Sequence, residues 1–242
     1  MRVAVLSDIH GNLPALDAVL AALAPFDEVW VLGDIVGYGP QPNEVVARLK
    51  QLRTKAVRGN HDASAIGALS TEAFNDDART AVEWTGGVLT PAAQRWLTGL
   101  PERSSTGDFT LVHGSPRDPT WEYLVSSALA SANMPAFATP HCLVGHTHVP
   151  LVFRDDAAGM QMLAPERGIA LELDERRLIL NPGSVGQPRD GDPRACGMLL
   201  DTSHKTATWQ RIPYPIAEVQ ARPSGRGSSW ALGLAMRLPV AV

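Results

Sequence analysis

Short apolar runs alternate with helical patterns over the first 60 residues of the chain. Apolar residues recur at helical spacing over 11–23 and again over 42–52, and Asn12 is placed to cap the first of these helices. The valine-rich runs beside them predict buried strands, at residues 3–7, 28–33 and 56–60. This order of strands and helices predicts a parallel sheet flanked by helices.

A mostly helical segment is expected over 63–101, where Thr90 and Pro91 mark the start of the last helix as N-cap and first helical residue. Strand patterns resume after it, at residues 109–114 and 142–146. These runs again precede a glycine or a polar residue, as the first three strands do.

Closely spaced strand runs follow Pro150, at 169–183 and 196–212. Within the first run, Asp174–Arg176 is predicted to be a hairpin turn. We expect the antiparallel strands to form a second sheet or to extend the first. The fold class is therefore α/β.

A single domain is expected over 1–242, since 45% of its residues are apolar and 19% are charged, as in ordinary globular proteins. Only the stretch 221–229 has the composition of a linker. It leads into an apolar tail at 228–242, which we expect to dock as a helix.

Charge and cysteine content narrow the range of partners. The net charge is -4, and no run of Lys or Arg is present that would follow a phosphate backbone, which argues against extended nucleic acid as a ligand. Cys142 and Cys196 lie in apolar stretches and are expected to be buried free thiols. The first apolar run leaves no room for a signal peptide, and no run is long enough to cross a membrane, so we expect a cytoplasmic protein.

Polar residues with metal-binding side chains follow these apolar runs. Five of the seven histidines lie just past them, next to Gly, Asp or Asn. Because parallel strands end at one edge of a sheet, these side chains are expected to converge in one crevice. The candidate ligands are Asp8, His10, Asp34, Asn60, His113, His146 and His148.

Carboxylates and imidazoles without thiolates suit Mn²⁺, Fe, Zn²⁺, Co²⁺ or Ni²⁺. Seven ligands, four of them imidazoles, are too many for one ion but suit two ions that share a carboxylate. If the stretch after Gly145 stays extended, His146 and His148 point to the same side of the chain. The sequence therefore indicates a dinuclear metal site.

Each block alone has a simpler explanation, because an Asp after a strand is often an N-cap and Gly-Asn-His-Asp is a common turn composition. Together, the five blocks resemble the calcineurin-like metallophosphoesterase superfamily, whose pattern is D-x-H, G-D, G-N-H-D/E, a lone His and G-H-x-H. The sequence NPGSVGQPRDGDPRA at 181–195 extends the resemblance, which covers residues 1–188, to the small bacterial and archaeal phosphodiesterase branch. The matching residues are Asp8-Ile9-His10, Gly33-Asp34, Gly59-Asn60-His61-Asp62, His113 and Gly145-His146-Thr147-His148.

The resemblance implies a two-sheet β-sandwich flanked by helices, in four αββα layers, with the helical segment 63–101 near the active site. It also implies a role for each position: one metal held by Asp8, His10 and His148, a second held by Asn60, His113 and His146, Asp34 as the bridge, and His61 as the catalytic residue near the phosphoryl oxygen or leaving group.

The expected activity is a dinuclear, metal-dependent phosphoesterase with two divalent ions, Mn²⁺ being the first candidate and Fe, Zn²⁺, Ni²⁺ or Co²⁺ the others. A metal-bridging hydroxide would attack a phosphodiester bond of a small phosphoester or nucleotide, with phosphomonoesters as an alternative substrate. A histidine such as His61 suits the charge on the departing oxygen. The rival hypotheses are a protein-docking scaffold and a nucleotide sensor on the same fold; intact ligand positions favour the enzyme. The sequence makes no prediction of oligomeric state.

Three further residues have two interpretations each. Asn12 could bind a substrate phosphate or only cap its helix. Arg189 could reach a substrate anion, but pairing with Asp190 or Asp192 on the surface is the commoner arrangement. Asp62 could orient the catalytic histidine or cap the next helix, and it is left out of the predicted site.

Overall fold

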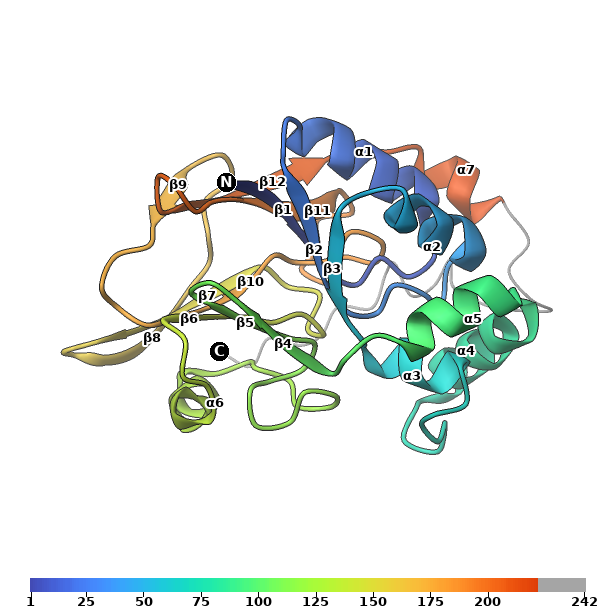
Figure 1. Ribbon diagram of the computed structural model, residues 1–242, viewed down its shortest axis with the longest axis horizontal. Helices are drawn as coiled ribbons and strands as arrows, with labels where there is room; N and C mark the ends of the chain where they lie inside the picture. The colour runs from blue at the N-terminus through green and yellow to red at the C-terminus, as the bar shows by residue number, and fades with distance from the viewer. Residues whose placement is uncertain (222–242) are drawn as a thin grey trace.

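Two six-stranded mixed sheets form the centre of the protein (Figure 1). The computed structural model describes residues 1–221. The first sheet, sheet A, has the order β3-β2-β1-β11-β12-β9, and the second, sheet B, has the order β4-β5-β6-β10-β7-β8. The apolar tail predicted at 228–242 lies outside the described residues.

Sheet A contains the strands expected at the start of the chain. Its first three strands are parallel to one another, as the alternation of strands and helices predicts, and β11 pairs antiparallel with β1. The bounds are β1 Arg2–Leu6, β2 Glu28–Leu32, β3 Thr54–Val57, β9 Ala170–Glu172, β11 Ala195–Asp201 and β12 Thr206–Ile212.

Sheet B has a parallel centre as well, because β5, β6 and β10 run in one direction. Antiparallel strands complete both of its edges. The bounds are β4 Arg103–Thr106, β5 Phe109–Val112, β6 His141–Leu143, β7 Leu151–Asp156, β8 Gly159–Leu163 and β10 Leu178–Asn181.

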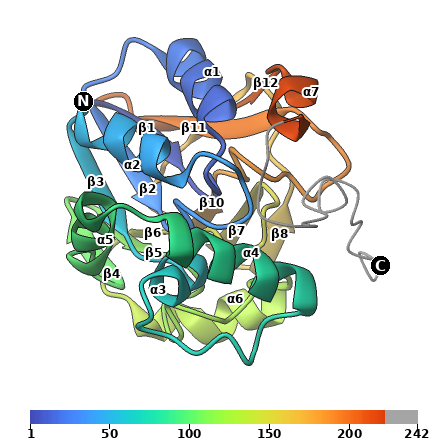
Figure 2. The same ribbon diagram turned by 90° about the vertical axis from the view of Figure 1, so that its right-hand side faces the viewer.

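Helices cover the outer faces of both sheets, which gives the expected four-layer αββα sandwich. Figure 2 shows α1 and α7 on one side of the sheets and α6 on the other, while α3, α4 and α5 lie together at one end in Figure 1. The bounds are α1 Leu13–Leu23, α2 Pro42–Lys50, α3 Asn60–Ala65, α4 Asp76–Val88, α5 Pro91–Thr98, α6 Ser127–Asn133, α7 Ile216–Gln220 and the short 3₁₀ helix η1 Met134–Ala136.

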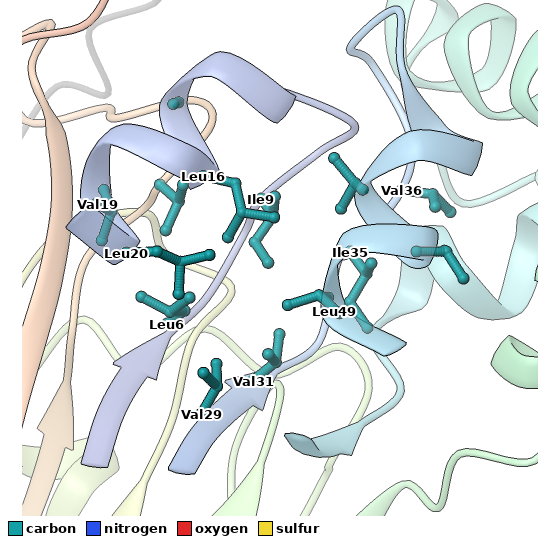
Figure 3. Packing of buried hydrophobic residues seen from close by; sticks show 14 of the residues in the cluster. Leu6, Ile9, Leu16, Val19, Leu20, Val29, Val31, Ile35, Val36 and Leu49 are labelled. Atoms are coloured by element: carbon teal, nitrogen blue, oxygen red, sulfur yellow. The ribbon is translucent and has the colours of Figure 1, made fainter. Parts of the chain in front are cut away.

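Alternating side chains of the central strands serve two cores. In β1, Val3 and Val5 face the core between the sheets, whereas Ala4 and Leu6 face the helices. Figure 3 shows how Leu6 packs beneath helix α1 in the helix-facing core. Burial on both faces explains why these strands are continuous apolar runs in the sequence.

The predicted hairpin at Asp174–Arg176 is wrong. A turn does form, with Asp174 Oδ1 accepting a hydrogen bond from the Arg176 backbone at 2.9 Å, but it joins strands of different sheets. Before the turn, β9 pairs with β12 of sheet A, and after it β10 lies between β6 and β7 of sheet B. Leu173 is buried between the sheets at this crossing, because the chain passes from one to the other there.

The hairpin of β7 and β8 and the edge strand β4 were not expected from the sequence. The predicted helical segment 63–101 is confirmed in α3, α4 and α5, with Thr90 capping the last. Both cysteines are buried and free, as predicted. No helix within residues 1–221 has the length and apolar character needed to span a membrane, and a cytoplasmic location stays a prediction.

Candidate metal centre

The candidate residues lie at the carboxyl ends of the strands that run parallel within each sheet. Asp8 and His10 follow β1, and Asp34 follows β2. The remaining strands contribute Asn60 and His61 after β3, His113 after β5, and His146 and His148 after β6. All eight side chains are at least 96% buried. The convergence predicted from the sequence is therefore what the fold produces.

The backbone of this region is left-handed at most ligand positions. Asp8, His10, Asp34, His146 and His148 have φ angles between 48° and 66°. The expectation that His146 and His148 share one face of an extended segment is therefore wrong. Left-handed backbone at residues other than glycine is unfavourable, and its clustering is typical of functional sites.

His10 and His148 each place one ring nitrogen on a backbone carbonyl: His10 Nδ1 lies 3.1 Å from Val36 O, and His148 Nδ1 lies 2.5 Å from Gln187 O. Because a carbonyl only accepts, Nδ1 carries the proton and Nε2 presents a lone pair in each neutral ring. Burial keeps both rings neutral by lowering the pKa of each well below its ordinary value.

The two Nε2 atoms of His10 and His148 nevertheless lie 3.2 Å apart. Asp8 Oδ1 lies 3.3 Å from His148 Nε2 and has no hydrogen-bond partner among the described residues. Three acceptor atoms that face one another without a hydrogen between them fit a divalent cation.

A second set of possible ligand atoms meets around His113. Its Nδ1 lies 2.8 Å from Leu32 O, and His146 Nε2 lies 3.2 Å from Trp121 O. The other nitrogens, His113 Nε2 and His146 Nδ1, are 3.0 Å apart, and Asn60 Oδ1 lies 2.9 Å from His113 Nε2. Two imidazole nitrogens and one amide oxygen therefore converge on a second point.

Asp34 lies between the two sets. Its Oδ2 is 3.7 Å from His10 Nε2 and 3.3 Å from His113 Nε2, while its Oδ1 accepts a hydrogen bond from the His61 backbone at 2.9 Å. Two groups could hold a metal ion, since the ligand atoms within each lie no more than 4.8 Å apart: Asp8, His10, Asp34 and His148, and Asp34, His113 and His146.

The electrostatics of the pair Asp34 and His113 agree with a cation site. Burial opposes both charges, yet their attraction holds the pKa of Asp34 well below its ordinary value and raises the pKa of His113 to about 9. Burial also raises the pKa of Asp8 to about 7. A bound divalent ion favours ionised carboxylates and neutral imidazoles, and it would release such protons.

His61 lies beside the cluster and outside both groups. Its Nδ1 is buried and has no hydrogen-bond partner among the described residues. Its ring centroid is 4.9 Å from that of His10, 4.6 Å from that of Tyr38 and 4.9 Å from that of Phe74. Because burial lowers the pKa of His61 to about 4, the ring is neutral near pH 7.

The side chain of Asn12 makes hydrogen bonds that stabilise the fold. Its Oδ1 accepts a hydrogen bond from Ala15 N at 3.2 Å, which confirms the predicted helix cap. Its Nδ2 donates to Gly186 O at 3.2 Å and to the Tyr214 hydroxyl at 3.4 Å. A role in substrate binding stays a prediction.

Asp62 positions the loop that carries Asp34. Its Oδ1 accepts hydrogen bonds from Ile35 N at 2.9 Å and Val36 N at 3.0 Å, and its Oδ2 accepts one from Gly59 N at 3.1 Å. The bond to Gly59 is the predicted helix cap, whereas the two others tie the loop after β2 to the start of α3.

The predicted surface pairing of Arg189 is wrong. Asp190 pairs with Arg211 and Asp192 pairs with Arg194, so both carboxylates are occupied by other arginines. The Arg189 Nη2 instead donates to the amide oxygen of Gln187 at 2.7 Å.

Two tyrosines at the cluster were missed. Tyr38, with φ at 53°, lies beside His61, and the Tyr123 ring stacks on His146 with centroids 3.8 Å apart. A tyrosine in a loop belongs to no motif. The one available signal is the aromatic pair in the stretch 120–124, shortly after the lone histidine.

Glu122 fixes the loop that holds Tyr123. It accepts hydrogen bonds from Ser115 Oγ at 2.6 Å and Asn133 Nδ2 at 2.7 Å, and it also pairs with Arg117. The hydrogen bond from Arg117, with help from the other donors, lowers the pKa of Glu122 to about 2. The ionised Glu122 carboxylate therefore holds in place the loop that carries Tyr123.

Comparison with known proteins identifies a family. The family model for the calcineurin-like phosphoesterase superfamily domain matches residues 1–205. Among solved structures, a metallophosphoesterase from Sphaerobacter thermophilus superposes with a TM-score of 0.88 at 46% identity, covering 97% of this chain and 98% of that one.

Curated proteins give the same result. An uncharacterized protein of Methanocaldococcus jannaschii is 36% identical over 225 residues, which cover 88% of each chain. The phosphodiesterase YfcE of Escherichia coli K12 is 29% identical over 212 residues, covering 82% of this chain and 87% of that protein.

Proposed function

Because the chain belongs to the calcineurin-like phosphoesterase superfamily, we propose that it is a dinuclear metal-dependent hydrolase of phosphodiesters. The observation that carries the proposal is the position of Asp34, whose Oδ2 faces His10 Nε2 on one side and His113 Nε2 on the other. A carboxylate that belongs to two groups of possible metal ligands suits a bridge between two ions.

Each ion has its own ligands in this proposal. Asp8, His10 and His148 would hold the first, Asn60, His113 and His146 would hold the second, and Asp34 would be shared by both. The opposed lone pairs of His10 and His148 support this assignment, because a cation between them removes their repulsion. Nitrogen and oxygen ligands without thiolate favour Mn²⁺, with Fe, Zn²⁺, Ni²⁺ and Co²⁺ as the other candidates.

Two divalent ions neutralise phosphoryl oxygens and supply a water-derived nucleophile near neutral pH. The protein contributes rigid placement, because four histidines donate their remaining N–H to backbone carbonyls of the fold. His61 contributes a neutral ring beside the cluster, and because its Nδ1 is buried, Nε2 is the nitrogen that would meet a ligand. Its single N–H can donate to the departing oxygen and stabilise the charge that develops there.

The substrate is proposed to be a small phosphodiester, nucleotides included, with phosphomonoesters as an alternative. The name of the E. coli relative, a phosphodiesterase, supports the diester. A net charge of -4 without a basic run disfavours extended nucleic acid.

The test is hydrolysis of bis(p-nitrophenyl) phosphate by metal-free protein reloaded with Mn²⁺. Asp34→Asn should abolish turnover and bind fewer ions per chain, and His61→Ala should lower kcat by about 10²- to 10⁴-fold while both ions remain bound. His204→Ala is the matched control, because that imidazole is 81% exposed and pairs with the nearby Asp201. Absence of turnover with every divalent ion tried, although two ions are bound, would refute the enzyme and favour a scaffold or sensor.

A further inference from the structure

Arg189 is attached directly to the segment that carries His148. Its backbone N lies 3.4 Å from His148 O, and its Nη2 donates to Gln187 Oε1 at 2.7 Å. The carbonyl of the same Gln187 receives the Nδ1 proton of His148. The guanidinium is therefore positioned by the residues that orient a candidate metal ligand.

The charge of Arg189 has no carboxylate partner in the part of the chain that the structure describes. The two acidic residues of its loop are taken, Asp190 by Arg211 and Asp192 by Arg194. Arg189 is half-buried, and its guanidinium donates to an uncharged amide oxygen, that of Gln187. A guanidinium in this state retains the capacity to bind an anion.

Two phenols, Tyr38 and Tyr123, lie close enough to Arg189 for its positive charge to act on both hydroxyls. Burial raises the pKa of both phenols, and the positive charge of Arg189 partly opposes that rise. Tyr38 lies against His61, and Tyr123 is stacked on His146 with 40% of its surface exposed. Arg189 thus lies near aromatic residues that contact two different histidines of the cluster, and one of these residues, Tyr123, is open to solvent.

We propose that Arg189 binds a non-bridging phosphate oxygen of the substrate and that Tyr38 and Tyr123 position its guanidinium for this contact. The proposal rests on the proposed function for the identity of the substrate. The planar guanidinium matches two phosphate oxygens, whereas lysine supplies only a point charge. The site is therefore predicted to prefer anions that present two oxygens, as phosphates and phosphodiesters do.

Binding of inorganic phosphate to the Mn²⁺-loaded protein, measured by isothermal titration calorimetry, tests the contact without turnover. Arg189→Met should weaken phosphate binding about 10- to 100-fold, since a charge-assisted hydrogen bond is lost. Arg189→Lys should recover only part of the loss. Tyr123→Phe, which keeps the ring on His146, should weaken binding about threefold to tenfold.

The metal content of each variant, measured by mass spectrometry, should stay equal to that of the parent, which shows that the cluster is intact. Arg194→Met is the matched control, because its guanidinium already pairs with Asp192 at 2.6 Å, and its phosphate affinity should not change. With bis(p-nitrophenyl) phosphate, the loss in Arg189→Met should appear mainly in KM.

Phosphate affinity of Arg189→Met within twofold of the parent would overturn the proposal, as would failure of the loaded parent to bind phosphate. Equal losses in Arg189→Met and in the Arg194→Met control would also contradict it. A parent that binds two ions and phosphate but hydrolyses no diester would refute the proposed function and leave the Arg189 contact supported.

Discussion

Removing the Asp62 carboxylate should weaken metal binding, although Asp62 is not among the candidate ligands. The side chain is fully buried and accepts three backbone N–H groups, two from the loop that carries Asp34 and one from Gly59. Asp62→Ala leaves all three donors buried without an acceptor. The loop after β2 then loses two hydrogen bonds to α3 and keeps the one from the His61 backbone to Asp34.

The magnitude follows from those three bonds. A hydrogen bond to a charged group contributes about 1.5–3 kcal/mol, but burial and the charge of Asp34 raise the pKa of Asp62 to about 7 and offset part of that gain, so the net loss should be about 3 kcal/mol. For a domain of this size, that is a fall in Tm of about 6–12 °C. Affinity for metal should fall about 10- to 100-fold, the usual effect of removing a group that orients a metal ligand.

The free energy of unfolding of Asp62→Asn should lie between that of the parent and that of Asp62→Ala. The amide oxygen can keep the bonds to Ile35 and Val36, while the amide N–H₂ meets the N–H of Gly59, so about 1–2 kcal/mol should be lost. Urea unfolding of the metal-free proteins and Mn²⁺ titration give the two quantities. Asp17→Ala is the control, because that carboxylate is 50% exposed and pairs with Arg48 at the surface.

A free energy of unfolding for Asp62→Ala within about 0.5 kcal/mol of the control, which is the usual range of surface substitutions, would refute the stability argument. Unchanged metal affinity in a destabilised Asp62→Ala would refute the positioning role. The two readouts therefore separate the role of Asp62 in the fold from its role at the site.

Three further predictions concern the surroundings of the site and the core. The pKa of Glu122 lies at about 2, below the ordinary 4.5, so the stabilisation from its charged form is present above pH 4.5 and is lost as the pH falls toward 2. In urea unfolding, Glu122→Gln should lower the free energy of unfolding by about 1–2 kcal/mol at pH 7 and by progressively less at pH 4 and pH 3. A difference that does not change with pH would contradict this. Gly186→Ala places a Cβ 2.0 Å from a backbone oxygen of the loop after β1 and should destabilise the protein by about 1–3 kcal/mol. Gly87→Ala has open space around it in α4 and should stabilise the protein by about 0.5–1 kcal/mol. Equal effects of the two variants on Tm would show that the packing argument is wrong. Burial raises the pKa of the Cys142 thiol and raises that of Cys196 to about 12. Ellman's reagent should therefore label neither thiol until guanidinium unfolds the chain. Rapid labelling of the folded protein would contradict the burial of these thiols.

Much of the site could be predicted because each ligand follows an apolar run that forms a strand. The run before Asp8 becomes β1 and the run before Asp34 becomes β2, and parallel pairing brings the ends of these strands together. The partners of β9 and β10 could not be predicted in the same way. The apolar pattern around Leu173 predicts strands, but it does not show that β9 joins one sheet and β10 the other.

The contacts of Arg189 could not be predicted either. Sequence proximity favours pairing with Asp190, whereas tertiary structure brings Arg211 of β12 to that carboxylate. The guanidinium thereby bonds to Gln187 and lies near two tyrosines that are distant in sequence. Local pattern identifies the residues that could act, and long-range packing decides which of them retain an unused charge.

The left-handed backbone at the ligands explains how these loops hold the ligands in place. Each residue of this kind costs about 1–3 kcal/mol, so several of them persist only where surrounding bonds fix the chain. The bonds are present: Asp8 N donates to Gly33 O at 3.1 Å, and His10 N donates to Asp34 O at 2.9 Å. The loop after β1 is thus hydrogen-bonded to the loop after β2, strand end to strand end. Because the fold itself supplies these bonds, the ligand atoms converge through the protein's own structure, and the repulsion between their lone pairs favours cation binding.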